Sequence, residues 1–375
     1  MASLTLSGCD EIANAFGLPR RYTLLADIRP AGETIMRAAP RIGAIVALFA
    51  LAQPAWADEI SDFYKGRTVS IVVGHQVGTG FDIYARLLAP HLSRHIPGNP
   101  TVIVQNMVGA SGITAANWLS SVAPKDGTVM ATFVHTVPYE PIFGNDKAQY
   151  DPAKLTWIGN MEESTGMCGV TKASGIATFE DLLAKEAIFG ATGATGPLGT
   201  FAQAVKNLVG AKLKVVYGYK GSADVKLAMN RGEVQGICGL PISTVKSFWG
   251  DEFRTGEFKP IIQLSGKPHA ELKGIPHVDR YAKTDEDRQV FGLIFGAQTL
   301  GRVYVSPPGQ PAARTKAMRD AMMATMKDEK FLADAVRAKI DIEPMTGEEV
   351  AAFIAKSSAV SPAVIARAKQ AFSRN

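Results

Sequence analysis

A glycine-rich loop between a predicted strand and a predicted helix is the part of this sequence best suited to chemistry. Residues 69–73 are mostly β-branched, which predicts a strand buried on both faces, and Gly74, Gly78 and Gly80 follow it. Asp82 stands where the apolar spacing of the next residues predicts the start of a helix. Such a loop brings backbone N–H groups and the positive end of a helix to one point, which suits an anion.

The spacing of these glycines excludes the common nucleotide sites. A dinucleotide site needs a small residue three positions after its second glycine, but Ile83 stands three positions after Gly80. The next predicted strand ends in Asn106, not in the acidic residue that would hold a ribose. The chain also contains no Gly-Lys-Ser or Gly-Lys-Thr, which a P-loop requires. We therefore expect no nucleotide and no other cofactor.

The elements that position this loop are repeated along the chain. Predicted strands alternate with predicted helices, which indicates an α/β protein with mostly parallel sheets flanked by helices. Two groups of such units predict two lobes, and ligands bind beyond the carboxyl ends of parallel strands. The loops expected at the crevice are residues 74–80, 106–112, 134–140, 191–200 and 218–224.

The predicted lobes are discontinuous in sequence. We assign residues 58–165 and 290–375 to lobe 1 and residues 166–289 to lobe 2. The helices predicted in the last part of the chain would pack on lobe 1, and they cover residues 311–326, 329–338, 347–356 and 362–372. Thr346 and Glu349 form a capping box before the third of these helices.

The first 57 residues are predicted to be absent from the mature protein. Residues 36–57 combine a basic start, a run of eleven apolar residues and a small-x-small site, which is typical of a cleaved secretory signal. The apolar run is too short to span a bilayer, which takes about 20 residues. The mature chain would begin at Asp58, and we interpret residues 1–35 as an unused upstream segment.

The charge and the cysteine content of the chain limit which partners and which cellular compartment we expect. The predicted mature chain carries 35 basic and 31 acidic side chains, scattered without runs, so we expect no nucleic-acid partner. Its two cysteines, Cys168 and Cys238, could form a disulfide in an oxidising compartment or stay as buried thiols. We predict no metal site, because His91 and His95 have helical spacing but no evident third ligand.

Segments in a fixed order along the chain carry a resemblance to a known family. They are "VSIVVGHQVGTGFDIYARLLAPHL" (69–92), "VIVQNMVGASGITAANWL" (102–119), "APKDGTVMAT" (123–132), "VVYGYKGSADVKLAMNRGEVQG" (215–236) and "SPPGQPAARTKAM" (306–318). The chain resembles the substrate-binding proteins of tripartite tricarboxylate transporters, the Bug-type periplasmic receptors. This resemblance implies a monomeric, type II, flytrap-like protein that closes on an organic acid and delivers it to integral-membrane transporter subunits.

The resemblance also implies which loops hold the ligand. In the family the acid is held largely by backbone N–H groups and ordered water, with one loop from each lobe. Neither loop of this chain contains arginine, so we do not expect a guanidinium to hold the acid. Carried over by position, the ligand-binding residues are Gly78, Thr79, Gly80, Phe81 and Asp82 in lobe 1, and Thr192, Gly193, Ala194, Thr195, Gly196 and Thr200 in lobe 2.

Further candidates each have a simpler interpretation. Asp82 could contact the ligand or cap its own helix. His135 and Thr136 follow a lobe 1 strand and could line the crevice, although a loop histidine is as often merely solvated. Tyr219 and Lys220 belong to a loop facing the same crevice, where Lys220 could attract a second carboxylate or lie on the surface.

We therefore expect a periplasmic receptor for a small organic carboxylate, serving a secondary transporter. We expect no catalytic residues, because the chain has no G-x-S-x-G nucleophile motif and the crevice loops offer chiefly Gly, Thr and Ala. Two alternatives stay open. One is an enzyme that acts on a small organic acid in the same crevice, and the other is a receptor that reports to a membrane sensor.

Overall fold

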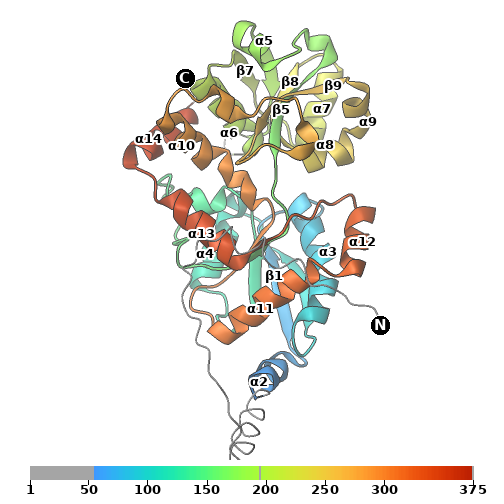
Figure 1. Cartoon of the computed structure of the whole chain (residues 1–375), viewed down its shortest axis with the longest axis vertical. Helices are drawn as coiled ribbons and strands as arrows, with labels where there is room; N and C mark the ends of the chain where they lie inside the picture. Colours follow the sequence, from blue (N-terminus) through green and yellow to red (C-terminus); the bar gives the residue numbers. More distant parts are fainter. Residues whose placement is uncertain (1–54, 194–195, 374–375) are drawn as a thin grey trace, which may run out of the picture. The chain divides into compact units, whose positions relative to one another are not determined.

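The structure, a computed structural model, describes residues 55–193 and 196–373 (Figure 1). The chain divides into the units Met1–Pro54 and Ala55–Asn375, and every described residue belongs to the second. The predicted signal peptide lies outside the described residues except for residues 55–57, which begin helix α2 (Ala55–Tyr64). Cleavage before Asp58 therefore stays a prediction.

The sheet of lobe 1 is mixed. Among the described residues it has six strands in the order β11-β4-β10-β3-β1-β2. β1 pairs in parallel with β2 and β3, whereas β10 runs antiparallel to β3 and β4, and β11 runs antiparallel to β4. The prediction of a mostly parallel sheet is thus wrong for the strands that come later in the chain. The bounds are β1 (Thr68–Val73), β2 (Thr101–Asn106), β3 (Val129–Thr132), β4 (Thr156–Asn160), β10 (Val303–Ser306) and β11 (Met345–Thr346).

The sheet of lobe 2 is mixed in the same way. Within the described ranges it has five strands in the order β7-β6-β8-β5-β9. β6 pairs in parallel with β7 and β8, and β5 runs antiparallel to β8 and β9. The bounds are β5 (Gly166–Thr171), β6 (Ala187–Gly190), β7 (Leu213–Val216), β8 (Gly236–Pro241) and β9 (Phe258–Leu264).

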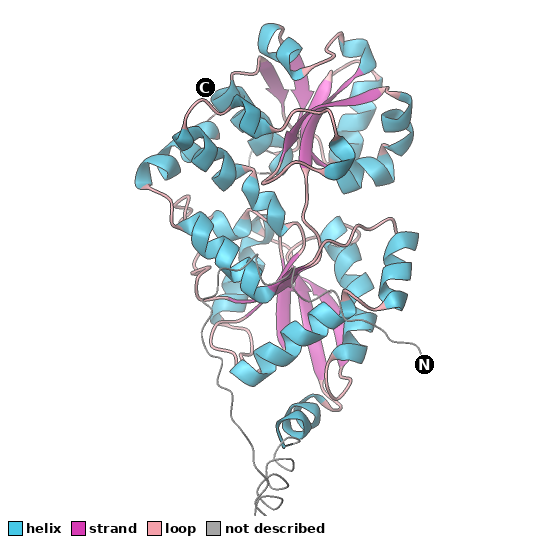
Figure 2. Cartoon of the chain, in the orientation of Figure 1, coloured by secondary structure: helices cyan, strands magenta, loops and turns pink. Residues whose placement is uncertain are grey.

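Helices cover the faces of both sheets (Figure 2). In lobe 1, β1 is buried as predicted, and its side chains Val69, Ile71 and Val73 pack in one apolar cluster with α3 and α11. The helices of lobe 1 are α3 (Gly80–His95), α4 (Ile113–Ser121), α11 (Ala312–Thr325), α12 (Glu329–Arg337) and α13 (Gly347–Ser358). The helices of lobe 2 are α5 (Phe179–Ala184), α6 (Pro197–Ala204), α7 (Ser222–Asn230), α8 (Ile242–Phe248) and α9 (Gly250–Thr255). Helices α10 (Asp285–Ile294) and α14 (Pro362–Ala371) complete the chain.

Local sequence signals account for several helix ends. The predicted capping box is confirmed, since the Thr346 side chain accepts from the Glu349 N–H and the Glu349 carboxylate accepts from the Thr346 N–H. Two further capping boxes, at Thr178 and Thr284, begin α5 and α10. A capping side chain contributes about 1 kcal/mol, so these residues help to fix where each helix starts.

Two chain segments connect the lobes and bond to each other. The first runs from β4 to β5, and the second runs from α10 through the turn Gly296–Leu300 into β10. The Asn160 side chain donates to the Thr299 carbonyl at 3.0 Å and accepts from the Arg302 N–H at 2.9 Å. The Ser164 N–H donates to the Gln298 carbonyl at 3.0 Å. These bonds position Arg302 where the lobes meet.

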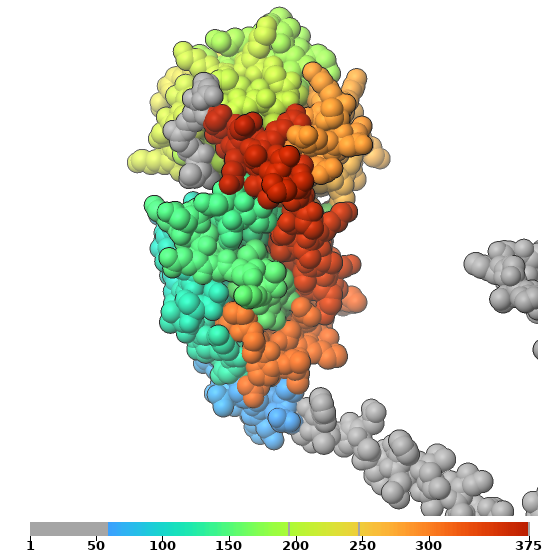
Figure 3. All heavy atoms as spheres, turned by 90° about the vertical axis from the view of Figure 1, so that its left-hand side faces the viewer, coloured from blue at the N-terminus to red at the C-terminus, as the bar shows by residue number. Residues whose placement is uncertain are grey.

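The last helix, α14, packs on lobe 2, although the sequence predicted that it packs on lobe 1. It contacts α10 and the short π-helix Val205–Val209. The Asn207 amide donates to the Ala371 carbonyl at 3.1 Å, and Arg367 pairs with Asp287. Figure 3 shows the red C-terminal segment running from one lobe onto the other. Within the described residues no single helix has the length and composition to cross a membrane, and α13 and α14 satisfy these criteria only as a pair bent by 92°.

Candidate ligand site

The predicted anion loop forms the start of helix α3. The helix begins at Gly80, two residues before the predicted start, and Thr79 is its N-cap residue. Gly78 has a φ of +80°, a conformation that glycine adopts without strain. The Gly78 N–H donates to the Asp82 carboxylate at 2.8 Å, so this donor is already used within the loop.

Asp82 holds this loop together and is not among the residues that line the cavity between the lobes. It is buried, and it accepts from the Asn106 amide at 2.9 Å and from the Arg86 guanidinium at 2.9 Å. The bond from Arg86, together with those from Gly78 and Asn106, outweighs burial and lowers the pKa of Asp82 to about 2. Asp82 is the third residue of α3, so the prediction of an N-cap position is wrong, although its carboxylate does satisfy a donor ahead of the helix.

A cavity of about 290 Å³ lies where the two lobes meet. Three groups of residues line it: loops of lobe 1, the connecting segments, and loops and helix starts of lobe 2. They are His75, Thr79, Gly80, Phe81, Val134 and His135; Ser164, Gln298 and Arg302; and Thr192, Pro197, Leu198, Ser222, Gly239, Leu240, Pro241 and Thr244.

Arg302 is the cationic side chain of this lining. It is 9% exposed, and its guanidinium lies over the rings of Phe81 and Tyr84, 4.7 and 4.5 Å from their centroids. Nη1 donates to the adjacent Gly301 carbonyl at 2.6 Å. Nε makes no hydrogen bond to any described residue, and it lies 3.6 Å from Oε2 of the buried Glu162. Nε therefore faces the Glu162 carboxylate, whereas Nη2 lies toward Gly80 and is the nitrogen through which the guanidinium would bond an anion in the cavity.

The glycine at position 80 makes room for this guanidinium. A Cβ atom at Gly80 would lie 3.0 Å from Nη2 of Arg302. The first N–H groups of a helix have no acceptor within the helix, and in α3 two of these belong to Gly80 and Phe81, which also line the cavity. The positive end of α3 and the Arg302 side chain are therefore close together, and both favour an anion.

Two histidines complete the polar part of the lining. Burial, with a smaller effect of the Arg302 charge, lowers the pKa of His75 and lowers that of His135 to about 3. Both rings are therefore neutral at pH 7. Their Nε2 atoms have no hydrogen-bond partner among the described residues. A neutral imidazole with a free ring nitrogen can donate a hydrogen bond to a bound carboxylate.

The sequence candidates divide between this cavity and other positions. Thr79, Gly80, Phe81, His135 and Thr192 line the cavity. Thr136 and Thr200 line a second chamber of about 280 Å³, whose other residues are Tyr139, Glu140, Phe143, Phe201, Leu293, Ile294, Ala297 and Phe372. Ala194 and Thr195 lie outside the described residues.

The remaining lobe 2 candidates do not line either chamber. Gly193 is exposed, and Gly196 is the N-cap residue of α6. The Tyr219 ring packs near Gly190, while Lys220 is exposed and its N–H donates to the Asp224 carboxylate at 3.1 Å. These positions favour the surface interpretation of Lys220.

Sequence reasoning missed the side chains from the connecting segments. Arg302, Gln298 and Ser164 follow no glycine loop, so no motif points to them. One signal was available: Arg302 is the only charged residue in the 16 residues 291–306. An arginine in such an apolar stretch predicts either burial with a partner or a binding role. Arg302 also differs from the expectation that no guanidinium takes part in the site.

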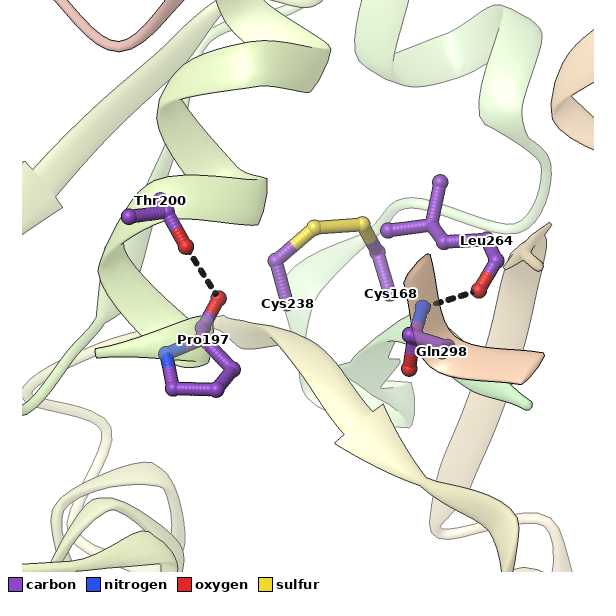
Figure 4. The surroundings of a disulfide bond; sticks show 6 residues. All are labelled: Cys168, Pro197, Thr200, Cys238, Leu264 and Gln298. Carbon is purple, nitrogen blue, oxygen red and sulfur yellow. Dashed lines mark hydrogen bonds between the residues drawn. A yellow bond between two sulfur atoms is a disulfide. The ribbon is translucent and has the colours of Figure 1, made fainter. Parts of the chain in front are cut away.

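Cys168 and Cys238 are joined as a disulfide between β5 and β8 (Figure 4). Figure 4 shows Pro197 of α6 on one side of the bond and Gln298 on the other, and both of these residues line the cavity. Gly239, which follows Cys238, has a φ of +73°, and a Cβ there would lie 2.6 Å from the Pro197 carbonyl oxygen. The disulfide therefore holds the strand that leads into the lobe 2 wall.

Histidine and acidic side chains of the described residues form ion pairs and no cluster of metal ligands. Among the described residues no group of three His, Cys, Asp or Glu side chains could hold a metal ion. His91 and His95 instead bond to Asp334 and Asp328 of the α12 region, at 2.9 and 2.8 Å. Two lobes with a cavity between them, a buried cation and a helix start define a solute-binding protein that takes an anion.

Comparison with known proteins identifies the family. The sequence model of the "Tripartite tricarboxylate transporter family receptor" matches residues 84–369, so the chain belongs to this receptor family. The expected resemblance is thus confirmed. A Cupriavidus necator protein named "UPF0065 protein in gbd 5'region" is 26% identical over 334 residues, covering 86% of this chain and 93% of that protein.

Solved structures confirm the two-lobed fold. The periplasmic binding protein BugD superposes with a TM-score of 0.59 at 18% identity, covering 82% of this chain and 98% of that one. The structure of R. palustris Rpa4515 with adipate superposes with a TM-score of 0.56 at 19% identity, covering 81% of this chain and 96% of that one.

Proposed function

We propose that this protein is a periplasmic receptor that closes on a small organic carboxylate, with Arg302 as its counter-charge. The observation that carries this proposal is the buried guanidinium, which lines the cavity between the lobes with its Nη2 close to Gly80 at the start of α3. The N–H groups of Gly80 and Phe81 and the neutral rings of His75 and His135 supply further donors. The adipate in a structural relative supports the ligand class.

The transport role and the location follow from the family and from the N-terminal sequence. Receptors of this family serve secondary transporters, and we propose that this chain delivers its ligand to membrane subunits as a monomer. The signal pattern at residues 36–57 supports export with a mature N-terminus at Asp58. N-terminal sequencing of the periplasmic protein tests this, and recovery of residues 1–35 would contradict it.

We further propose that the cavity carries out no catalysis. Nucleophilic catalysis needs a base within hydrogen-bond reach of a nucleophile. The Nε2 atoms of His75 and His135 have no hydrogen-bond partner among the described residues, so neither Nε2 atom is in contact with a serine or threonine hydroxyl of the lining. Incubating the purified protein with its acid and finding a converted product would contradict this proposal.

The decisive experiment begins with the natural ligand. Acid released from the purified protein is identified by mass spectrometry, and its affinity is then measured by calorimetry. We expect Arg302→Gln to weaken binding by at least ~30-fold, because charge-assisted hydrogen bonds contribute about 1.5–3 kcal/mol. The matched control is Arg288→Gln, an exposed arginine paired with Asp285, and it should leave affinity unchanged.

Loss of Arg302 leaves Glu162 buried without a counter-charge, so the variant could unfold. The double variant Arg302→Gln with Glu162→Gln removes both charges and keeps the test valid. Circular dichroism checks the fold of each variant. Wild-type affinity in the folded double variant would exclude Arg302 from the site and refute the proposal.

A further inference from the structure

The charged, imidazole and amide groups of the cavity lining lie on one side, whereas the polar side chains of lobe 2 in the lining are the hydroxyls of Thr192, Ser222 and Thr244. Lobe 1 and the connecting segments supply Arg302, His75, His135 and Gln298. The lobe 2 residues that line the cavity are all uncharged, and four of them, Pro197, Leu198, Leu240 and Pro241, are apolar. A carboxylate bound near Arg302 would therefore direct the rest of the ligand toward a weakly polar wall.

Two backbone features reduce what the lobe 2 helix starts offer to a second carboxylate. Pro197 is the first residue of α6 and has no N–H, and the Gly199 N–H already donates to the Gly196 carbonyl at 3.0 Å. At the start of α7, the Asp224 carboxylate accepts from the Lys220 N–H. Asp224 adds a negative charge to the turn that would otherwise attract an anion.

The charge balance of the cavity also favours a single anion. Arg302 is the one cationic side chain among the described lining residues, and Glu162 offsets part of its charge from 3.6 Å. His75 and His135 are neutral because burial lowers the pKa of both. A second carboxylate would lose its hydration without gaining a counter-charge.

The second chamber lies directly behind this lining. His135, Leu198 and Gln298 line the cavity, while their close neighbours in sequence, Thr136, Phe201 and Ala297, line the chamber. The ring of His135 stacks against that of Phe201 with centroids 6.0 Å apart, so the linings of the two spaces are in contact through these rings.

This chamber is mostly apolar. Its lining includes the rings of Tyr139, Phe143 and Phe372, and the one charged residue among its described lining is Glu140. An anionic side chain disfavours a carboxylate there, whereas an apolar group would be buried favourably.

We propose that the natural ligand is a monocarboxylate with an apolar body, held by its acid group at Arg302. The body lies against the lobe 2 wall and toward the aromatic chamber. This inference rests on the proposed function and narrows its ligand class. It differs from the adipate of the structural relative, which has two carboxylates.

Matched acids test the ligand class by calorimetry with the full mature protein. Hexanoate and adipate have the same carbon chain, and 4-methylbenzoate and 1,4-benzenedicarboxylate have the same ring. In at least one pair, we expect the monocarboxylate to bind at least tenfold more tightly than its dicarboxylate. The inference would be overturned if neither monocarboxylate binds at least tenfold more tightly than its dicarboxylate, or if none of the four acids binds.

A variant of the lobe 2 wall supplies an independent test. Thr244 of α8 is half-buried and lines the cavity, so Thr244→Lys would place a cation opposite Arg302. We expect this change to raise the affinity for the dicarboxylate at least tenfold, whereas Thr244→Met, of similar length but uncharged, should not. No gain in the lysine variant would count against the single-anion site.

The two proposals fail in different ways. Dicarboxylate binding that is tight and lost in Arg302→Gln would overturn the monocarboxylate inference but leave the receptor proposal intact. Acid binding that does not depend on Arg302 would overturn both.

Discussion

Replacing Gly80 with alanine would test whether Arg302 acts from the position that it occupies here. Gly80 is the first residue of α3 and its φ is not left-handed, so alanine fits the backbone. Alanine also favours a helix by up to ~1 kcal/mol relative to glycine. The new Cβ, however, would lie 3.0 Å from Nη2 of Arg302, closer than the ~3.5–4.0 Å of favourable non-bonded contacts.

The expected result is that stability and affinity change in opposite directions. The guanidinium must retreat by roughly 0.5 Å or more to restore normal contact with the new methyl group. Charge-assisted hydrogen bonds contribute about 1.5–3 kcal/mol and depend steeply on geometry, so we expect a loss of about 1.4 kcal/mol, or tenfold in affinity. The free energy of unfolding should stay the same or rise by up to ~0.5 kcal/mol.

Gly78→Ala is the matched control. Its backbone conformation does not suit alanine, and its added Cβ would not approach Arg302. Gly78 has a φ of +80°, and no atom lies within 4 Å of the position that a Cβ would occupy. Alanine there should reduce stability by about 1–2 kcal/mol through backbone strain. It touches neither Arg302 nor any other group, so affinity should be unchanged.

Calorimetry with the identified acid and urea unfolding measure the two quantities for both variants. The reasoning fails if Gly80→Ala binds as tightly as the wild type, because Arg302 would then tolerate displacement or take no part in binding. It also fails if Gly78→Ala weakens binding as much as Gly80→Ala, because loop strain alone would then explain the effect.

Two further predictions concern the disulfide and the buried histidine. If Cys168 and Cys238 are joined in the exported protein, mass measurement after alkylation without reductant should find neither thiol modified. Replacing both with serine should lower the free energy of unfolding by about 4 kcal/mol, because the bond closes a loop with a sequence separation of 70. Burial lowers the pKa of His135 to about 3, against about 6.5 in the unfolded chain. Only the unfolded state therefore gains this proton as pH falls from about 6.5 to about 3, and stability should decrease by up to ~1.4 kcal/mol per pH unit. His135→Gln should flatten this slope in urea unfolding between pH 7 and pH 5, and an equal slope in the variant would show that His135 is not the group responsible.

The sequence by itself determined the elements whose signals are local. The strand of residues 69–73, the loop that follows and the C-terminal helices were predicted within a few residues of their observed bounds, because apolar spacing and capping residues act over one or two turns. The family could likewise be inferred from motifs that are contiguous in the chain. The strands that escaped prediction, among them β9 and β10, pair antiparallel with strands that are mostly distant in sequence.

The tertiary structure alone decided which of these residues share a cavity. The sequence predicted an anion site at the start of α3, and Gly80 and Phe81 do line the cavity there. It could not place Arg302 beside them, because that proximity depends on β10 entering the first sheet between β3 and β4. Nor could it show that Asp82 would turn inward to hold the loop, or that α14 would return to lobe 2. The spacing of apolar and capping residues along the chain sets the helices and strands. Contacts between distant segments exist only once both sheets have formed, and those contacts set the charge of the site.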